Sequence, residues 1–183
     1  ERIVLDEQIG NKVKVKTDLF EITYNSIGPE IERVELLKHP SKESPNENFV
    51  ILNKTFGHNY TGQIGLIGDG LANHKDEFFI PEAHYELAGD SDVLEVPFSI
   101  VKDNVTVIHT FTFTRGSYVI KINTMVKNGR QEDLDVHAYY QLVRDDSNPS
   151  GSSMMMPTYT GVALFTEDSK YKKIDFSDIK KGQ

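Results

Sequence analysis

The pattern of apolar and polar positions along the chain is that of β-strands, and it is clearest in residues 105–126, VTVIHTFTFTRGSYVIKINTMV. Apolar residues alternate with threonine before the tripeptide Arg115-Gly116-Ser117, and the alternation resumes after it. A period of two residues is that of a strand with one buried face, and Gly116 supplies the positive φ that a tight connection often needs. The segment therefore predicts a β-hairpin whose inward positions are Val105, Val107, Phe111, Phe113, Tyr118, Ile120, Ile122 and Val126.

Similar alternating or β-branched runs recur along the chain and are separated by turn-forming residues such as Asp69-Gly70 and Asn128-Gly129. No segment keeps a helical period for long. Short strands at this spacing are typical of packed antiparallel sheets, so the chain is predicted to be an all-β sandwich. Besides the hairpin, strands are expected at residues 12–16, 19–24, 31–37, 49–53, 60–67, 92–100, 135–142 and 161–165.

A short helix is expected near the end of the chain, in residues 171–180. There Phe176 and Ile179 lie one turn apart and would face a buried side, while Lys172 and Lys173 would be exposed. Loops are expected at residues 39–48, 68–77 and 144–153, where Pro, Gly, Ser, Asn and charged residues cluster.

Length, charge and cysteine content exclude several classes of protein. The 183 residues fit a single domain, residues 1–183, because domains typically contain about 100–200 residues. A net charge of −8 argues against a nucleic-acid partner, since phosphate binding requires clustered Lys and Arg. The absence of cysteine excludes disulfides, thiolate nucleophiles and zinc–thiolate sites. No stretch approaches the roughly 20 apolar residues of a membrane span, so this segment is expected to be soluble.

The histidines and acidic residues do not form a recognisable catalytic or metal-binding pattern. The six histidines lack His-x-His or His-x-x-x-His spacing, and His109 occupies an inward strand position where a packing role is favoured. Residues 65–77 contain Asp69, His74, Asp76 and Glu77, which could hold a divalent cation, but their spacing fits no EF-hand or phosphate loop. A solvated turn is the favoured interpretation, and we expect no catalytic residue, cofactor or metal.

Two segments towards the end of the chain have the composition of interaction surfaces. The methionines at 154–156 could form an adaptable apolar surface for variable partners, although filling of the core is the favoured interpretation. Downstream, aromatic residues alternate with lysines and acidic residues, a composition found at interfaces, and they are Tyr159, Phe165, Tyr171 and Phe176.

Three segments together resemble the periplasmic domain of the bacterial membrane-protein insertase YidC. The central strand pair, FTFTRGSYVIKINTMVKN, resembles a strand pair of that domain, and so does the later segment GSSMMMPTYTGVALFTEDSKYKKIDFSDI. Near the start, Val15-Lys16-Thr17-Asp18 followed by Leu19, Ile22, Gly28 and Ile31 resembles its opening strands. No single motif is diagnostic, but their order and spacing extend over roughly residues 13–179.

The resemblance implies a β-supersandwich similar to galactose mutarotase, of which residues 1–183 would form about the first two-thirds. It also implies a transmembrane anchor before residue 1 and a membrane-embedded insertase region further downstream. The segment would then lie on the periplasmic face of the bacterial inner membrane. If one sheet lacks its neighbouring strands, an exposed edge strand is expected to favour self-association.

By the same resemblance, the expected function is that of a non-catalytic scaffold or docking module for the translocon accessory subunits SecD and SecF. The residues expected to contact this partner are Tyr159, Gly161, Tyr171, Lys172 and Phe176, and a pure packing role for the aromatic residues among them stays open. The alternative is a carbohydrate- or extended-polymer-binding module that uses a cleft of the sandwich. A sugar-modifying enzyme ranks third, because no His–Glu pair can be assigned, and the absence of tryptophan weakens both sugar-related interpretations.

Overall fold

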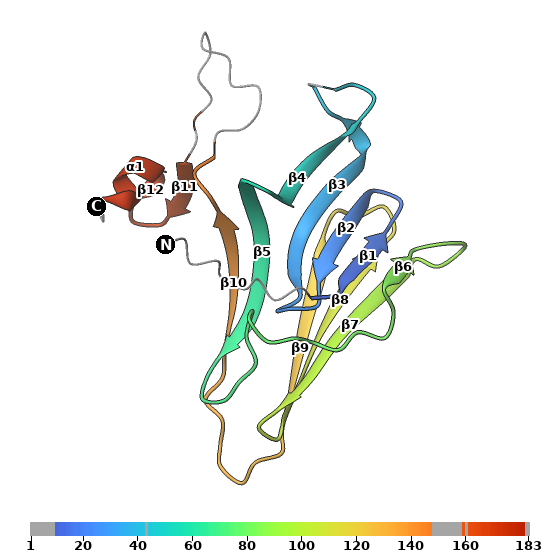
Figure 1. Cartoon of the computed structure of the whole chain (residues 1–183), viewed down its shortest axis with the longest axis vertical. Helices are drawn as coiled ribbons and strands as arrows, with labels where there is room; N and C mark the ends of the chain where they lie inside the picture. The colour runs from blue at the N-terminus through green and yellow to red at the C-terminus, as the bar shows by residue number, and fades with distance from the viewer. Residues whose placement is uncertain (1–9, 43, 148–158, 160, 182–183) are drawn as a thin grey trace. The chain divides into compact units, whose positions relative to one another are not determined.

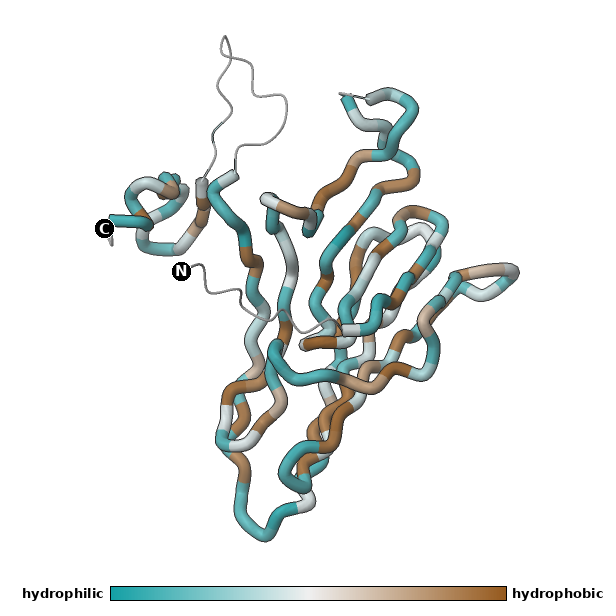
Figure 2. Tube along the Cα trace, in the orientation of Figure 1, coloured by the Kyte–Doolittle hydropathy of each residue, from teal (hydrophilic) through white to brown (hydrophobic). Residues whose placement is uncertain are grey.

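β-Strands make up nearly all of the regular structure, as the alternating pattern predicts (Figure 1). The computed structural model describes residues 10–42, 44–147, 159 and 161–181. Figure 2 shows hydrophobic and hydrophilic positions alternating along the strands, while the loop at residues 129–136 is largely hydrophilic. The elements are β1 (Lys12–Lys16), β2 (Phe20–Asn25), β3 (Glu30–Pro40), β4 (Asn48–Thr55), β5 (His58–Ile67), β6 (His84–Glu86), β7 (Val93–Lys102), β8 (Val105–Thr114), β9 (Ile120–Asn128), β10 (His137–Arg144), β11 (Gly161–Thr166), β12 (Lys170–Asp175) and α1 (Phe176–Lys180).

The chain divides into two compact units, residues 1–143 and residues 144–183. The first unit contains a seven-stranded sheet in the order β10-β5-β4-β3-β2-β1-β6 and a three-stranded sheet in the order β7-β8-β9. β1 pairs with β6 in parallel, with Lys14 opposite His84, and the pairs from β1 to β5 and from β7 to β9 are antiparallel. The predicted all-β antiparallel sandwich is confirmed, while the single domain over residues 1–183 stays a prediction.

The core of the first unit lies between these two sheets. Tyr24 of the larger sheet is fully buried, and its ring centroid lies 5.6 Å from that of Phe98 and 4.9 Å from that of Phe111 in the smaller sheet. Phe20 and Phe113 make a further contact across the core, with ring centroids 6.0 Å apart. Aromatic pairs at such distances add to the stabilisation from the apolar area they bury.

The predicted central hairpin is confirmed as β8 and β9. The strands pair antiparallel from Val105 opposite Asn128 to Phe113 opposite Ile120, and Gly116 in the connection has a φ of +70°. Its inward β8 positions are buried, and the inward β9 positions Ile120, Ile122 and Val126 pack partly buried against the core. Tyr118 differs from the expectation, because it precedes the strand and its side chain is 46% exposed.

Loops at one end of the two sheets are held together by Arg130. The two-residue turn between β7 and β8 has positive φ at both Asp103 (47°) and Asn104 (62°), the geometry preferred in tight hairpins. Arg130 donates from Nε to the Asp103 carbonyl at 2.9 Å and from a terminal nitrogen to the Asp69 carbonyl at 3.0 Å. One side chain therefore joins the β7–β8 turn, the loop after β5 and the loop after β9.

The second unit contains the β11–β12 hairpin and α1, and here the expected helix was too long. α1 begins at Phe176, whereas residues 170–175 form β12 and pair with β11 from Gly161 opposite Asp175 to Thr166 opposite Lys170. No residue of α1 is buried, and Ile179 is 47% exposed, so the expected buried side of the helix is wrong. In residues 170–175, successive side chains point to opposite faces because the segment pairs with β11. This pairing overrides the helical spacing of the sequence.

Candidate functional site

The two faces of the β11–β12 hairpin differ in the residues that they present. Residues directly opposite each other in an antiparallel pair point to the same side. The pairs Gly161–Asp175, Ala163–Lys173 and Phe165–Tyr171 therefore share one face, and the alternating pairs Val162–Ile174, Leu164–Lys172 and Thr166–Lys170 share the other.

The first of these faces carries exposed aromatic rings and a lysine between them. Tyr171 is 64% exposed and Phe165 is 68% exposed. The Nζ of Lys173 lies 4.7 Å from the ring centroid of Tyr159 and 6.0 Å from that of Tyr171, within the range of cation–π attraction. We call the set Tyr159, Gly161, Ala163, Phe165, Tyr171 and Lys173 the aromatic–lysine face.

Tyr159 is held on this face by a local contact with Gly161. Its hydroxyl donates to the Val162 carbonyl at 3.1 Å, and a Cβ at position 161 would lie 2.4 Å from that hydroxyl and 2.6 Å from the Ile174 carbonyl oxygen. Glycine is thus required at position 161 by close packing. Desolvation, followed by the charge of Asp175, raises the pKa of the Tyr159 phenol above its ordinary value.

The structure brings together three of the five expected contact residues, namely Tyr159, Gly161 and Tyr171. Lys172 lies on the opposite face, beside Leu164. Phe176 is the first residue of α1, and its ring centroid lies 5.7 Å from the guanidinium carbon of Arg144. Phe165 is among the aromatic residues that the sequence assigns to an interaction surface, although it is not one of the five expected contact residues. Lys173 is missing from the prediction because residues 171–180 are expected to be helical, whereas β12 pairs with β11.

The lysines of β12 keep their charges uncompensated within the described part of the second unit. Lys180 contacts Asp146, and the Nζ of Lys181 lies 3.9 Å from Asp178. None of the three lysines of β12 has a carboxylate of a described residue within ion-pair distance. The Nζ of Lys170 lies 5.9 Å from the Phe165 ring centroid. The strand therefore presents free positive charge next to aromatic rings, in a chain whose net charge is −8. These lysines are Lys170, Lys172 and Lys173.

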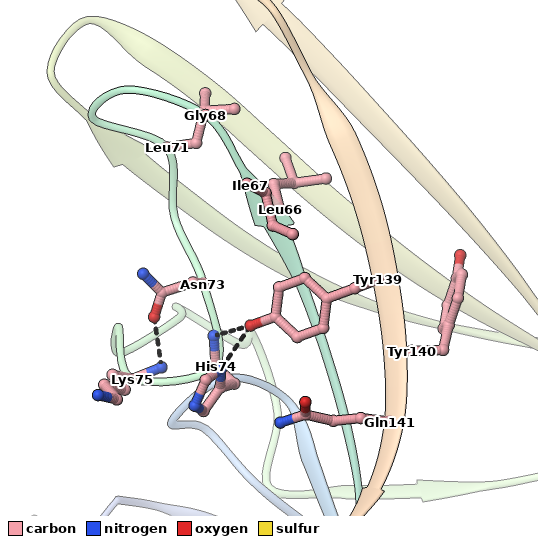
Figure 3. A pocket seen from close by; sticks show the side chains of 10 residues that line it. All are labelled: Leu66, Ile67, Gly68, Leu71, Asn73, His74, Lys75, Tyr139, Tyr140 and Gln141. Atoms are coloured by element: carbon pink, nitrogen blue, oxygen red, sulfur yellow. Dashed lines mark hydrogen bonds between the residues drawn. The ribbon is translucent and has the colours of Figure 1, made fainter.

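The first unit has a separate pocket of about 530 Å³ between the edge strand β10, the end of β5 and the loop that follows β5 (Figure 3). We call it the β10 pocket. Leu66, Ile67 and Leu71 supply its apolar lining, and the side chains of Asn73, His74 and Lys75 line it from the loop. In Figure 3 the ring of Tyr139 reaches from β10 towards this loop, whereas Tyr140 extends from the other side of the strand.

The Tyr139 ring has a fixed position in the β10 pocket. The backbone N–H of His74 donates to its hydroxyl at 3.1 Å, and the same hydroxyl makes a hydrogen bond with Nδ1 of the His74 ring. The hydroxyl occupies the space beside Gly65, where a Cβ would lie 2.3 Å from it. The loop that carries His74 also contacts Gly28, whose backbone N–H donates to the Asp76 carbonyl at 2.8 Å.

A chain of polar contacts connects the rim of the pocket to a buried carboxylate. Gln141 donates to Gln63 at 2.6 Å, and Gln63 donates to Glu30 at 2.7 Å. Glu30 also accepts hydrogen bonds from Lys54 at 2.9 Å and Thr61 at 3.1 Å. Burial opposes ionisation of Glu30, but these hydrogen bonds and the charge of Lys54 outweigh it and lower its pKa. Because its oxygens accept hydrogen bonds from three side chains, the Glu30 carboxylate has a structural role.

Asp76, in the loop between β5 and β6, makes structural contacts. Asp76 accepts a hydrogen bond from the Asn73 backbone N–H at 2.8 Å, and its two oxygens receive the Lys102 ammonium at 2.8 and 2.9 Å. In the described residues, no group of three or more His, Asp and Glu side chains is arranged to hold a metal ion. The methionines at 154–156 lie outside the described residues.

Comparison with known proteins decides the family. A family model described as the YidC periplasmic domain matches residues 12–183. The chain belongs to this family. The resemblance seen in the sequence is thereby confirmed, and so is the predicted periplasmic location. Within the part of the chain that the structure describes, no helix has the length and apolar character needed to cross a bilayer.

Relatives with the name membrane protein insertase YidC are similar over almost the whole chain. The protein of Nitrosospira multiformis is 41% identical over 94% of the chain and 31% of its own length. The protein of Methylobacillus flagellatus is 38% identical over 95% of the chain and 32% of its own length. The protein of Nitrosomonas europaea is 36% identical over 95% of the chain and 29% of its own length. The chain thus spans about a third of the length of the curated YidC relatives it matches.

Proposed function

We propose that this YidC periplasmic domain is a non-catalytic docking module that binds a translocon accessory subunit, SecD or SecF, through the aromatic–lysine face. The observation that carries the proposal is the arrangement of Phe165, Tyr171 and Lys173, two largely exposed rings and a free lysine on one face of a hairpin. Rigid aromatic side chains lose little conformational entropy on binding and are enriched at interface hot spots.

The chemistry of the face fits a protein partner that offers acidic and apolar groups together. A carboxylate on the partner would pair with Lys173, which has no carboxylate within ion-pair distance in the described residues. The rings of Phe165 and Tyr171 would then be covered by apolar side chains around that pair. Because exclusion of water strengthens a charge pair, the aromatic residues and the lysine support the same contact.

Site-specific photo-crosslinking in the full-length, membrane-anchored protein tests this proposal. A photoreactive residue placed at Tyr171 or Phe165 is expected to give a discrete adduct with SecD or SecF, identified by mass spectrometry. Lys172 is the matched control, because it is the next residue on the same strand but points to the other face. Equal adducts from Tyr171 and Lys172 would show that the aromatic–lysine face is not the docking surface.

Loss-of-contact variants give a second, independent measurement. Tyr171→Ala is expected to reduce co-purification of the accessory subunit, whereas Lys172→Ala is expected to leave it nearly unchanged, because the two side chains lie on opposite faces. If neither variant changes co-purification, and a glycan screen instead finds a specific saccharide, the alternative of a carbohydrate-binding module takes its place.

A further inference from the structure

The rim of the β10 pocket carries more hydrogen-bond donors than its own contacts use. Lys75 is exposed, and its ammonium has no ion-pair partner among the described residues, because the adjacent Asp76 is bound by Lys102. The side-chain oxygen Oδ1 of Asn73 accepts the Lys75 backbone N–H at 3.0 Å, which leaves the side-chain NH₂ of Asn73 to donate elsewhere. The rim therefore offers a cation and an amide donor two residues apart in one loop.

The His74 ring adds a third donor. The Tyr139 hydroxyl already accepts the backbone N–H of His74, so its own proton is available for Nδ1 of the ring. A neutral ring that accepts at Nδ1 carries its proton on Nε2, and a protonated ring carries one there as well. In both states the residues at 73–75 present donors, and such a set favours an anionic oxygen group over a neutral one.

An apolar wall lies next to these donors. Ile67 is 59% exposed and lines the pocket together with the ring of Tyr139 (Figure 3). The ring is fixed by its two contacts with His74 and by the absence of a side chain at Gly65, so the wall exists before any ligand binds. The pocket volume of about 530 Å³ lies within the range of about 300–1,000 Å³ typical of small-molecule sites.

We propose that the β10 pocket binds a small amphiphile with one anionic head group, a carboxylate or a phosphate ester, attached to a short apolar chain. The head group is bound by Lys75 with the Asn73 amide and the His74 ring, and the apolar chain lies against Ile67 and Tyr139. The site is distinct from the aromatic–lysine face, and its occupation requires none of the residues assigned to docking.

Binding of matched probes to the full chain tests the proposal. Octyl phosphate carries both proposed parts, inorganic phosphate carries the head group alone, and octyl glucoside carries the same tail on a neutral sugar. Each is titrated below its micelle concentration by calorimetry, and the site is located by amide shifts in NMR spectra. We expect octyl phosphate to bind most tightly, with shifts centred on residues 66–75 and 139–141. Equal affinity for inorganic phosphate would overturn the proposal, because the apolar chain would then contribute nothing to binding.

Variants show whether the named residues carry the binding. Lys75→Ala should weaken octyl phosphate binding about tenfold, because a charge-assisted contact is lost, while Lys121→Ala removes an exposed lysine of β9 and should have no effect. Gly65→Ala should also weaken binding by displacing the Tyr139 ring, and circular dichroism checks that it folds. Equal binding of octyl glucoside, an unchanged affinity in Lys75→Ala, shifts located elsewhere, or no saturable binding would each overturn the proposal.

Discussion

Acidic pH should destabilise the fold through the buried ring of His109. The residue lies on the inward side of β8 and is 1% exposed. Its Nδ1 contacts the Thr124 hydroxyl at 2.8 Å, and its ring centroid lies 5.3 Å from that of Phe78. Its Nε2 has no hydrogen-bond partner among the described residues. Burial disfavours a charged imidazolium at this position and lowers the pKa of His109 from 6.5 to about 4.

The direction and size of the effect follow from the difference in pKa between the two states. The unfolded chain takes up a proton at His109 near pH 6.5, whereas the folded chain does so only near pH 4. Stability is therefore fully present above pH 6.5 and falls as the pH falls through this window. The loss attributable to this group is about 2 kcal/mol at pH 5 and about 3 kcal/mol below pH 4.

The assay is urea unfolding followed by circular dichroism between pH 7 and pH 5, with the wild type compared to His109→Asn. Asparagine keeps a polar group for Thr124 but cannot titrate, so the variant should lose stability at pH 7 and show a smaller further loss at pH 5. The difference between the two pH dependences isolates His109 from all carboxylates. Parallel losses in both proteins would refute the reasoning, and an NMR titration giving His109 a pKa near 6.5 would do the same.

Three further substitutions test the packing. Gly28→Ala should lower the free energy of unfolding by about 3 kcal/mol or more, because the φ is +62° and the new Cβ would lie 2.3 Å from the backbone of residue 74. Gly89→Ala is the control, since its φ is +60° but no atom lies within 4 Å of the new Cβ. A similar loss of stability in both variants would refute the clash. Arg130→Ala should lower the free energy of unfolding by about 2 kcal/mol by removing donors to two loop carbonyls, measured by urea unfolding, and an unchanged midpoint would contradict it. Gly161→Val should displace the Tyr159 ring and reduce photo-crosslinking from Tyr171, without changing the melting temperature of the first unit. An undiminished yield of the adduct would show that the fixed position of Tyr159 is not needed.

Much of the fold could be predicted because the strands of the first unit have one buried face. In β8 every second residue from Val105 to Phe113 is buried, and such a period leaves little choice of structure. The three-residue strand β6 could not be found in this way, because its parallel partner β1 lies far away in the sequence. β12 was missed for a different reason, since its lysines and tyrosine form a strand only when β11 is beside them.

The candidate sites were less accessible from the sequence. The exposed aromatic residues near the end of the chain were visible, but the separation of Tyr171 and Lys172 onto opposite faces depends on a register that no local pattern fixes. The β10 pocket was not anticipated, because His74 and Tyr139 are 65 residues apart and neither belongs to a motif. The glycine at position 65 was the available signal, since a glycine within a strand often marks a close approach by another group.

The order of the strands has a consequence for how the chain reaches its native state. β7, β8 and β9 follow one another and pair with their immediate neighbours, so this sheet needs only short-range encounters to form. The parallel pairing of β1 with β6 joins Lys14 to His84 and requires the closure of a long loop. The smaller sheet should therefore act as the folding nucleus, and the edge made by β1 should remain the last to be covered. During emergence into the periplasm, that edge would be the region most in need of protection by chaperones.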